Sequence, residues 1–380
     1  MPPKRRCRKF VKILCGRLLG DRRENIMNKL QKLRDRLKAS ELDAIIVLDE
    51  LNQHYLSDFS FTDGLLVITA TEAHLITDFR YYEMALSECN PEFKVVTPKN
   101  RWEYISEALS GARRVGFEGD YVSYSTYNAY KQKLSFCELV SVGSMLAEIR
   151  QIKSREEIEL IQKAQDIADA AFSELLTVLN PNMTENEVAV ELEYRMRRLG
   201  AEGFSFDTIA VSGDASSLPH GTPRMKKLSS GFLTMDFGAK YKGYCSDMTR
   251  TVVIGRADDE MKKLYNTVLS AQLAAIDFLR EGVDAGEADK VARDIIDGVL
   301  EFKGAFGHSL GHSVGLFVHE TPTLSPRSFG RALRTGEILT VEPGIYLFGK
   351  YGCRIEDMVA IEPDGVYNFT HSPKDLIEIY

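Results

Sequence analysis

The sequence predicts an α+β protein of two domains, a smaller amino-terminal α/β domain and a larger domain of helices and strands. The chain has 380 residues, more than one ordinary hydrophobic core accommodates. Short apolar runs typical of strands alternate with helical patterns as far as about residue 147. Beyond that point, two capped helical patterns precede a series of apolar runs broken by turn residues. We therefore place the domains at 27–147 and 148–380.

The first of these domains begins with a helical pattern and continues as alternating strands and helices. Leu30, Leu33 and Leu37 recur at the spacing of one helix face. Strands are predicted for three apolar runs bounded by turn residues, at 44–49, 65–69 and 74–77. Such alternation is typical of an α/β domain.

The second domain begins with two helices whose first turns carry capping signatures. Ser154 and Glu157 form the S-x-x-E pattern of a capping box, and Thr184 repeats the pattern with Glu187. Strands follow in "FDTIAVSG", "GFLTMDFGA" and "YCSDMTRTVVIG". Two further helical patterns come next, at about 257–281 and 284–302. The chain closes with the strand-like pieces "EILTVEPGIYL" and "CRIEDMVAIEPDG".

The composition is that of a soluble globular protein. Hydrophobic residues make up 44% of the chain and charged residues 27%, and no apolar run approaches the ~20 residues that span a bilayer. None of the six cysteines forms a C-x-x-C pair, so the sequence indicates neither a zinc knuckle nor a redox site. The cysteines are scattered along the chain: Cys7, Cys15, Cys89, Cys137, Cys245 and Cys353. A chain of this length needs no disulfides, so we expect a reducing, cytoplasmic compartment.

The formal charge of −7 conceals an asymmetry along the chain. Residues 1–26 contain nine Lys or Arg and two acids, whereas the remainder has 39 basic and 53 acidic side chains. The acidic bulk excludes nucleic acid and anionic membranes as expected partners.

Residues 1–26 lack the unbroken apolar centre of a signal peptide. We expect a disordered basic arm or an extension upstream of a natural start at Met27, with surface attachment to nucleic acid or membrane as the alternative.

Four acidic residues stand within apolar runs, where carboxylates are rarely buried without a partner. Asp236 follows the apolar run "GFLTM", and Asp247 lies beyond the next turn, so a hairpin could bring both to one end of a sheet. Glu342 follows "EILTV", and Glu356 follows "GCRI". Each acid alone has a structural explanation, such as an edge strand or a pair with a nearby base.

Together, the four carboxylates carry a charge that two divalent cations would balance. Without metal they would repel one another and resist ionisation at neutral pH. Oxygen ligands with one imidazole suit Mn²⁺, with Co²⁺, Zn²⁺ or Fe²⁺ as alternatives, and the lack of a thiolate argues against a structural zinc site. A bridged pair of ions can acidify a water molecule and polarise a carbonyl, while a nearby carboxylate passes the proton to a leaving amine. This chemistry is hydrolysis, most simply of an amide.

The segment 306–320, "FGHSLGHSVGLFVHE", carries three of the seven histidines of the chain, His308, His312 and His319. The first two have the i, i+4 spacing of a helix face. A glycine at every fourth position instead favours a strand or loop whose backbone approaches other groups closely. Beside the four acids, we expect one imidazole to bind metal and the others to face a substrate. The alternative is three structural histidines.

Several motifs together resemble the pita-bread metallopeptidases, specifically the aminopeptidase P and prolidase branch that cleaves before proline. They are "SSLPHGTP", "MDFGAKYKGYCSDMTRT", "GHSLGHSVGLFVHETP", "VEPGIY" and "RIED". The resemblance covers Met27 to the carboxyl terminus and implies a catalytic domain with a curved antiparallel sheet backed by helices, in a homodimer. The segment "LDELNQHYLSDFSFTDGLL" also resembles the creatinase-like amino-terminal domain of this branch, which methionine aminopeptidases lack.

The resemblance also implies a role for each site residue. Five side chains would bind two metal ions: Asp236, Asp247, His312, Glu342 and Glu356. Asp247 and Glu356 would bridge the ions, and Glu342 would also move the proton of the attacking water. Three histidines would line the substrate site and stabilise the tetrahedral intermediate: His220, His308 and His319. Arg354 and Tyr346 would hold Asp236 in place.

The activity implied by the resemblance is that of an X-Pro aminopeptidase, which acts on peptides with proline in second position. Many dipeptidase members carry an arginine after the H-E-x-P motif to receive the terminal carboxylate of the substrate. Thr323 occupies that position here, although a substitute could come from Arg327, Arg331 or Arg334. An X-Pro dipeptidase, or prolidase, is therefore the alternative. A creatinase-like hydrolase without metal and a non-catalytic interaction protein are more remote, because the acidic set is complete.

Overall fold

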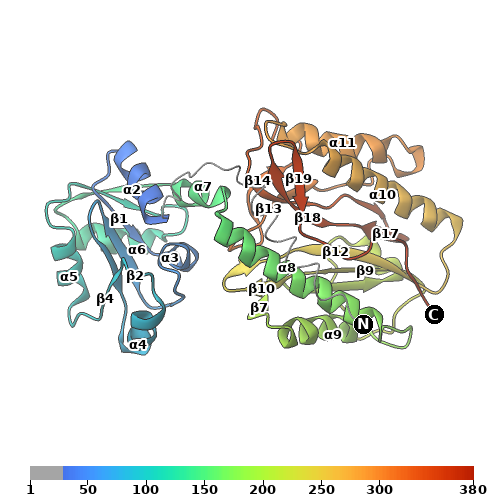
Figure 1. Ribbon diagram of the computed structural model, residues 1–380, viewed down its shortest axis with the longest axis horizontal. Helices are drawn as coiled ribbons and strands as arrows, with labels where there is room; N and C mark the ends of the chain where they lie inside the picture. The colour runs from blue at the N-terminus through green and yellow to red at the C-terminus, as the bar shows by residue number, and fades with distance from the viewer. Residues whose placement is uncertain (1–28) are drawn as a thin grey trace. The chain divides into compact units, whose positions relative to one another are not determined.

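The structure is a computed structural model that describes residues 29–380, so the basic segment predicted at 1–26 lies outside the described residues. These described residues form two compact units, 29–150 and 151–380 (Figure 1). Each unit has its own core of fully buried apolar side chains. Within the described range, every helix is too short or too polar to span a bilayer.

The first unit is built on a mixed six-stranded sheet in the order β4-β3-β2-β1-β5-β6. Strands β1, β2 and β3 pair antiparallel, whereas β4, β5 and β6 join parallel neighbours. The strands are β1 (Ala44–Val47), β2 (Leu65–Thr69), β3 (Ala73–Ile76), β4 (Lys94–Val96), β5 (Arg114–Phe117) and β6 (Glu138–Ser141). The helices are α2 (Lys29–Ala39), α3 (Glu50–Ser57), α4 (Phe79–Glu88), α5 (Arg101–Ala108), α6 (Tyr124–Lys133) and α7 (Met145–Gln151).

Apolar patterning explains this unit. The three leucines at helical spacing, Leu30, Leu33 and Leu37, are all buried in α2. All four side chains of β1 are buried, as expected for a central strand that has apolar neighbours on both faces. The alternation of strands and helices expected from the sequence is confirmed.

Two helices of the second unit begin at the capping boxes that the sequence predicts. The Ser154 hydroxyl accepts from the backbone N–H of Glu157, whose carboxylate accepts from the N–H of Ser154. Thr184 and Glu187 form the same pair of hydrogen bonds. The long helices of this unit are α8 (Arg155–Leu176), α9 (Glu185–Arg198), α10 (Asp259–Phe278) and α11 (Ala285–Asp297).

The strands of the second unit form two main sheets, ordered β20-β12-β9-β8 and β14-β13-β15-β18-β19, and two smaller ones, β11-β10-β7 and β16-β17. The strands pair antiparallel, as expected. The exception is β20, which pairs parallel to β12. The strands that carry or border the site are β8 (Ile209–Ser212), β9 (Gly231–Phe237), β12 (Met248–Ile254), β13 (Gly311–Ser313), β14 (Glu320–Leu324), β15 (Ile338–Val341), β16 (Gly344–Leu347), β17 (Tyr351–Arg354) and β18 (Asp357–Glu362). The others are β7 (Gly203–Phe204), β10 (Ala239–Tyr241), β11 (Tyr244–Cys245), β19 (Gly365–Asn368) and β20 (Glu378–Ile379).

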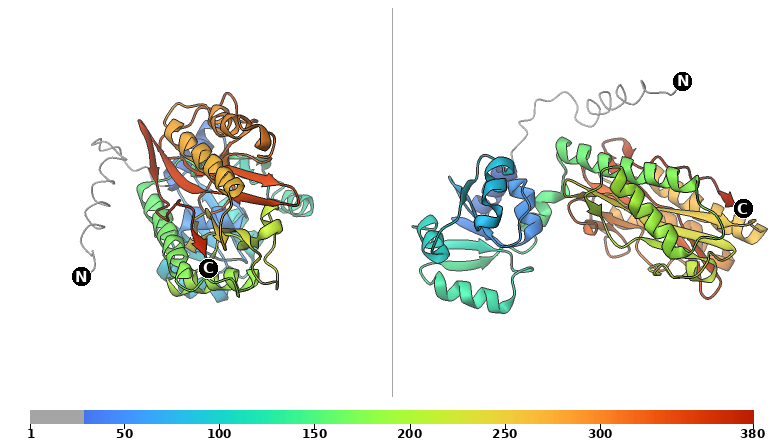
Figure 2. Two further views of the ribbon diagram at one scale, coloured as in Figure 1. Left: turned by 90° about the vertical axis from the view of Figure 1, so that its right-hand side faces the viewer. Right: turned by 90° about the horizontal axis from the view of Figure 1, so that it is seen from below.

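Helices pack on both main sheets. Phe172 of α8 stacks on Phe237 of β9, with ring centroids 6.2 Å apart, in a core that α9 completes. Leu264 of α10 shares a second core with Leu339 of β15 and with apolar residues of α11. The strands lie between α9 on one side and α10 with α11 on the other (Figure 1 and Figure 2). Apolar faces of both sheets are thereby covered, and the strand ends are left to form a site.

A buried arginine links the two main sheets. Arg250 of β12 is 1% exposed, and its guanidinium donates to Asp357 Oδ1 of β18 at 2.8 Å and to the Glu356 carbonyl oxygen at 2.6 Å. It also donates to the carbonyl oxygens of Ser372 and Pro373, at 2.9 and 3.1 Å. One guanidinium therefore connects β12 to β18 and to the segment that follows β19.

Replacing Arg250 by methionine is expected to lower the free energy of unfolding by about 3 kcal/mol, because Asp357 stays buried with Lys374 as its remaining cation. Urea denaturation followed by circular dichroism measures this change. Arg155→Met, which removes a partly exposed ion pair with Glu159, is the control and should move the midpoint little. A loss below about 1 kcal/mol for Arg250→Met would contradict the importance of this contact.

Candidate metal centre

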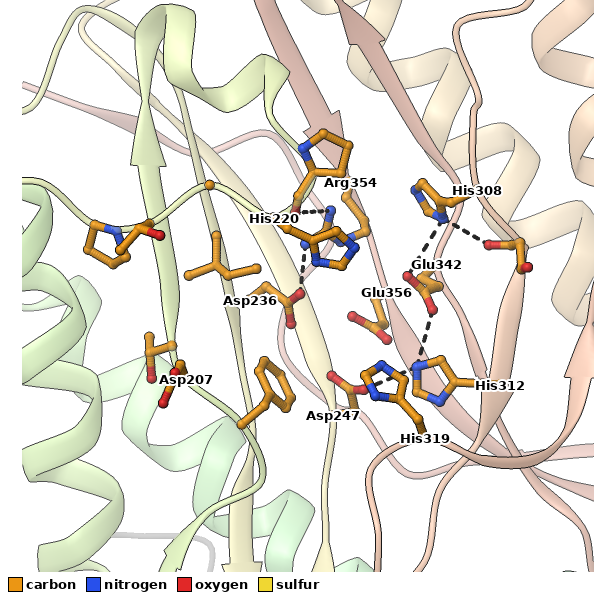
Figure 3. Close-up of a pocket in the computed structure, with 18 residues that line it drawn as sticks. Asp207, His220, Asp236, Asp247, His308, His312, His319, Glu342, Arg354 and Glu356 are labelled. Carbon is orange, nitrogen blue, oxygen red and sulfur yellow. Dashed lines mark hydrogen bonds and ion pairs between the residues drawn. The ribbon is translucent and has the colours of Figure 1, made fainter. Parts of the chain in front are cut away.

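The four predicted carboxylates converge from strand ends of both main sheets (Figure 3). Asp236 lies in β9 opposite Thr249 of β12, and Asp247 stands two residues before Thr249. Glu342 directly follows β15, and Glu356 lies between β17 and β18. The expected hairpin exists, with a small β10–β11 hairpin inserted between its long strands. It brings Asp236 and Asp247 to one end of the sheet.

These side chains line a cavity of about 490 Å³. The structure brings all the predicted metal-binding and substrate-facing residues to it: Asp236, Asp247, His220, His308, His312, His319, Glu342 and Glu356. The wall formed by residues 206–209 is not predicted from the sequence, although "FDTIAVSG" carries a signal, because polar residues stand at the start of an apolar strand. Asp207 of this wall lies well apart from the other carboxylates (Figure 3).

Three side chains offer ligand atoms that all lie within 4.8 Å of one another: Asp247, His312 and Glu356. His312 Nε2 is 3.6 Å from Asp247 Oδ2 and 3.4 Å from Glu342 Oε1. Carboxylate oxygens with one imidazole form a donor set that suits Mn²⁺ and similar divalent ions.

One carboxylate oxygen of the cavity residues, Oδ1 of Asp236, is buried without a hydrogen-bond donor among the described residues. Asp236 Oδ2 accepts from Arg354 Nη2 at 2.7 Å, whereas Asp236 Oδ1 has no such partner in that range. A buried oxygen of this kind costs free energy unless a donor or a cation meets it. The residues therefore fit a metal ion, both by the chemistry of their donor atoms and by this oxygen.

Two family models match the chain. "Creatinase/Prolidase N-terminal domain" matches residues 29–152, and "Metallopeptidase family M24" matches residues 159–363. The chain belongs to metallopeptidase family M24. A relative from Bacillus subtilis (strain 168), "Uncharacterized peptidase YqhT", is 42% identical over 352 residues, which cover 92% of this chain and 99% of the relative.

Solved structures resemble this M24 chain over nearly its whole length. The Xaa-Pro dipeptidase from Bacillus anthracis has a TM-score of 0.89 and 39% identity, covering 93% of this chain and all of its own. The X-Pro aminopeptidase from Thermotoga maritima MSB8 has a TM-score of 0.86 and 34% identity, covering 91% and 100%. The resemblance to the pita-bread fold and to the X-Pro peptidase branch is confirmed.

Buried threonines orient two carboxylates of the M24 site. Thr249 Oγ1 donates to Glu356 Oε2 at 2.6 Å. Thr340 Oγ1 donates to Glu342 Oε1 at 3.2 Å and accepts from the backbone N–H of His312 at 3.0 Å. Such partners fix the orientation of metal-binding groups. Thr340 was not predicted, since a threonine in an apolar strand carries no signal of what it contacts.

Arg354 places a buried positive charge at the site. Its guanidinium donates to Asp236, to Thr249 Oγ1 at 3.0 Å and to the Tyr346 hydroxyl at 2.7 Å. The Tyr346 hydroxyl in turn lies 3.0 Å from His308 Nε2. Tyr346 is thus joined to Asp236 through Arg354, and it also connects Arg354 to one of the histidines.

The histidine segment forms a short strand and loops, as its glycine pattern predicts. His312 lies in β13, and His308 and His319 lie in the loops before and after this strand. A Cβ atom on Gly311 would stand 2.0 Å from the Thr340 carbonyl oxygen, so this approach of β13 to β15 requires glycine. The rings of His312 and His319 are 4.5 Å apart.

Burial and mutual repulsion favour the protonated forms of the acids in the metal-free protein. Burial, together with the charges of Glu356, Asp236 and Glu342, raises the pKa of Asp247 well above its usual range. Burial raises the pKa of Glu342 to about 8, although the positive charge of Arg354 opposes this shift. Burial and the neighbouring carboxylates likewise raise the pKa of Glu356.

Three histidines of the cavity, His308, His312 and His319, are held neutral. Burial lowers the pKa of His308 to about 4, with the charge of Arg354 acting in the same direction. Burial and the neighbouring His319 lower the pKa of His312 to about 4. Burial also lowers the pKa of His319. A neutral imidazole is the form that binds metal and offers one donor and one acceptor to a substrate.

The metal-free protein is expected to lose stability as the pH rises, because Glu342 binds its proton more tightly in the folded chain. Between its usual pKa of 4.5 and the folded-state pKa of about 8, the folded state holds more protons, so the free energy of unfolding falls with pH. Glu342→Gln should reduce that fall by at least about 1.4 kcal/mol, the equivalent of one pKa unit. Thermal unfolding in a chelator across this window measures it, and equal slopes for both proteins would refute the shift.

Proposed function

We propose that this M24 chain is a metal-dependent X-Pro aminopeptidase, which hydrolyses the amide bond between an amino-terminal residue and a following proline. The observation that carries the proposal is the convergence of five ligand-type side chains on one cavity, where a buried oxygen of Asp236 has no donor among the described residues. Relatives named as an X-Pro aminopeptidase and as Xaa-Pro dipeptidases support a proline-directed peptidase. An X-Pro dipeptidase is the second candidate.

Five side chains would hold two divalent ions: Asp236, Asp247, His312, Glu342 and Glu356, with Asp247 and Glu356 shared between the ions. Four carboxylates balance the charge of two such ions. Mn²⁺ is the expected metal, and Co²⁺, Zn²⁺ and Fe²⁺ are the alternatives. When bound, the ions would supply an acidified water molecule and polarise the carbonyl of the scissile bond.

Glu342 is the proposed proton carrier. Its carboxylate lines the cavity, lies 3.4 Å from His312 Nε2 and accepts a hydrogen bond from Thr340. A carboxylate in this position can accept the proton of the attacking water and release it to the leaving proline nitrogen.

The three histidines proposed to face the substrate differ in whether their ring nitrogens are hydrogen-bonded to other protein groups. His308 is committed, because its Nε2 lies 3.0 Å from the Tyr346 hydroxyl and its Nδ1 lies 2.9 Å from the Ser309 carbonyl oxygen. His319 and His220 line the cavity without a hydrogen bond from their rings to the described part of the chain. This difference supports His319 and His220 as donors to the substrate carbonyl. His308 would join them by exchanging one of its bonds.

The charge of the cavity supports an aminopeptidase over a dipeptidase. Of the described residues that line it, Arg354 is the one Lys or Arg, and it is bonded to Asp236. Asp207 adds a negative charge on the opposite wall. This arrangement disfavours the terminal carboxylate of a dipeptide and suits the ammonium group of a peptide amino terminus.

The other candidates for a carboxylate-binding cation lie outside this lining. Arg331 and Arg334 both pair with the buried carboxylate of Glu337, at 2.7 and 3.0 Å. Thr323 bonds the hydroxyls of neighbouring serines, and Arg327 lies with it at a separate surface depression. Position 323 thus carries threonine where many dipeptidase members carry an arginine, and no other arginine among the described lining residues takes over that role.

We further propose a cytoplasmic enzyme that acts as a homodimer. The cysteines within the described residues are all free thiols, which supports a reducing compartment: Cys89, Cys137, Cys245 and Cys353. Light scattering coupled to size-exclusion chromatography tests the dimer.

With added Mn²⁺, the purified protein is expected to cleave Gly-Pro-Xaa peptides at least about tenfold more efficiently than the dipeptide Gly-Pro. The reason is that Arg354, which is bonded to Asp236, is the one Lys or Arg among the described residues of the lining. Chromatographic quantification of released glycine gives kcat/KM for each length, with a Gly-Ala-Xaa series as the control for proline specificity. If the dipeptide alone is cut, the chain is a prolidase. If activity survives a chelator, hydrolysis without metal replaces the present proposal.

His312→Ala should lose metal affinity and peptidase activity together, each by at least about 10²-fold, because it removes the imidazole that stands between Asp247 and Glu342. Mn²⁺ binding is measured by calorimetry and activity by the peptide assay. His371→Ala, which replaces a mostly exposed histidine, is the control and should keep both properties. A wild-type protein that binds none of Mn²⁺, Co²⁺ and Zn²⁺ would instead favour the non-catalytic alternative.

A further inference from the structure

A buried lysine outside the cavity lining lies against the histidine segment. The side chains of Lys153 and Glu320 are 1% and 5% exposed, and Lys153 Nζ is 3.3 Å from Glu320 Oε2. Lys153 Nζ also donates to Ser313 Oγ at 2.9 Å. Lysine is almost never buried to this degree unless it is paired, and replacing a buried ion pair by apolar side chains is often neutral for stability. Stability alone therefore does not account for this pair.

The ammonium group closes the base of a loop that carries site histidines at both ends. Ser313 and Glu320 are paired residues of β13 and β14, at a point where the strand register shifts. His312 directly precedes Ser313, and His319 directly precedes Glu320. Both histidines are thus chain neighbours of a residue that Lys153 holds, and their rings are 4.5 Å apart.

The loop between these strands is packed on the Glu320 carboxylate. Glu320 Oε1 accepts from the backbone N–H of Phe317 at 3.4 Å, and a Cβ atom on Gly315 would stand 2.6 Å from Glu320 Oε2. The Gly315 carbonyl oxygen also accepts from the backbone N–H of Cys245 at 2.8 Å. The path of the loop therefore depends on a buried carboxylate, and Lys153 places a positive charge beside that carboxylate.

Lys153 is itself held firmly on its own side. Its backbone N–H donates to the Gly336 carbonyl oxygen at 3.0 Å. The next residue, Ser154, caps α8. The ammonium group is thus presented to the loop from a fixed point of the catalytic unit.

We propose that Lys153 is a positioning residue of the metal centre. Its ammonium group, held between Ser313 and Glu320, fixes the placement of His312 relative to His319 and thereby sets the affinity of the His312 site for a divalent cation. This inference rests on the proposed role of His312 as a metal ligand. A lysine with a purely structural role would stabilise the fold without changing metal affinity.

Lys153→Met tests this role in the full chain, because methionine keeps much of the side-chain length and removes the charge. The dissociation constant of Mn²⁺ is measured by competition with a chromophoric chelator, and the visible spectrum of bound Co²⁺ reports the ligand geometry. We expect Mn²⁺ to bind about 10- to 100-fold more weakly and the Co²⁺ spectrum to change, as for the loss of other residues that orient metal ligands.

Two further variants separate positioning from stability. Arg224→Met is the matched control, because it deprives another buried carboxylate, Glu185, of its guanidinium partner. It should lower the unfolding temperature and keep the wild-type Mn²⁺ affinity. The double variant Lys153→Met/Glu320→Gln removes both charges, so it should regain thermal stability while its Mn²⁺ affinity stays weak. If Lys153→Met does not fold, the double variant carries the test.

Wild-type Mn²⁺ affinity in Lys153→Met would overturn the positioning role and leave the proposed function intact. If the double variant regained both thermal stability and wild-type Mn²⁺ affinity, the positioning role would likewise be overturned and the proposed function would stand. A wild-type protein that binds neither Mn²⁺ nor Co²⁺ would instead overturn the proposed function, and this inference would fall with it.

Discussion

Repulsion among four carboxylates gathered in one cavity is the constraint on which the structure of the second unit depends. Each acid stands at or near a strand end, and donors from strand residues compensate three of the four. Arg354 neutralises one oxygen of Asp236, and the hydroxyls of Thr249 and Thr340 bond Glu356 and Glu342. The compensation is incomplete, since one Asp236 oxygen has no donor within the described range. The charges that destabilise the metal-free protein are thus the same charges that give it affinity for a cation.

The histidines of segment 306–320, His308, His312 and His319, show how one short stretch supplies side chains with different roles. They are similar in sequence context, because each stands near glycine and apolar residues. The fold gives them different partners. His308 joins a chain of hydrogen bonds that runs from Arg354 through Tyr346, while His312 faces the acids and His319 keeps its ring nitrogens for the cavity. Since burial holds all three neutral near pH 7, they can donate or accept a hydrogen bond without adding charge to the site.

Features that depend on neighbouring residues could be predicted from the sequence. The capping boxes at Ser154 and Thr184 involve residues three apart, and acids that follow apolar runs mark the ends of buried strands. Contacts between distant residues could not be predicted by local pattern. Asp236 and Arg354 are 118 residues apart, and Lys153 and Glu320 are 167 apart, so their meeting depends on how the sheets pack. Family resemblance identified Arg354, whereas Lys153 became visible through its burial.

Lys153 also bears on how the catalytic unit can be produced by itself. The segment that matches the M24 family model begins at residue 159, beyond Lys153 and beyond the capping box of Ser154 and Glu157. A recombinant fragment cut at residue 159 would remove Lys153 from beside the buried Glu320 carboxylate and would remove the first turn of α8. A fragment that begins at Gln151, where the compact unit begins, keeps both features. The amino-terminal boundary of a stable catalytic fragment is therefore set by the buried ion pair of Lys153 and by the helix cap at Ser154, not by the extent of sequence similarity.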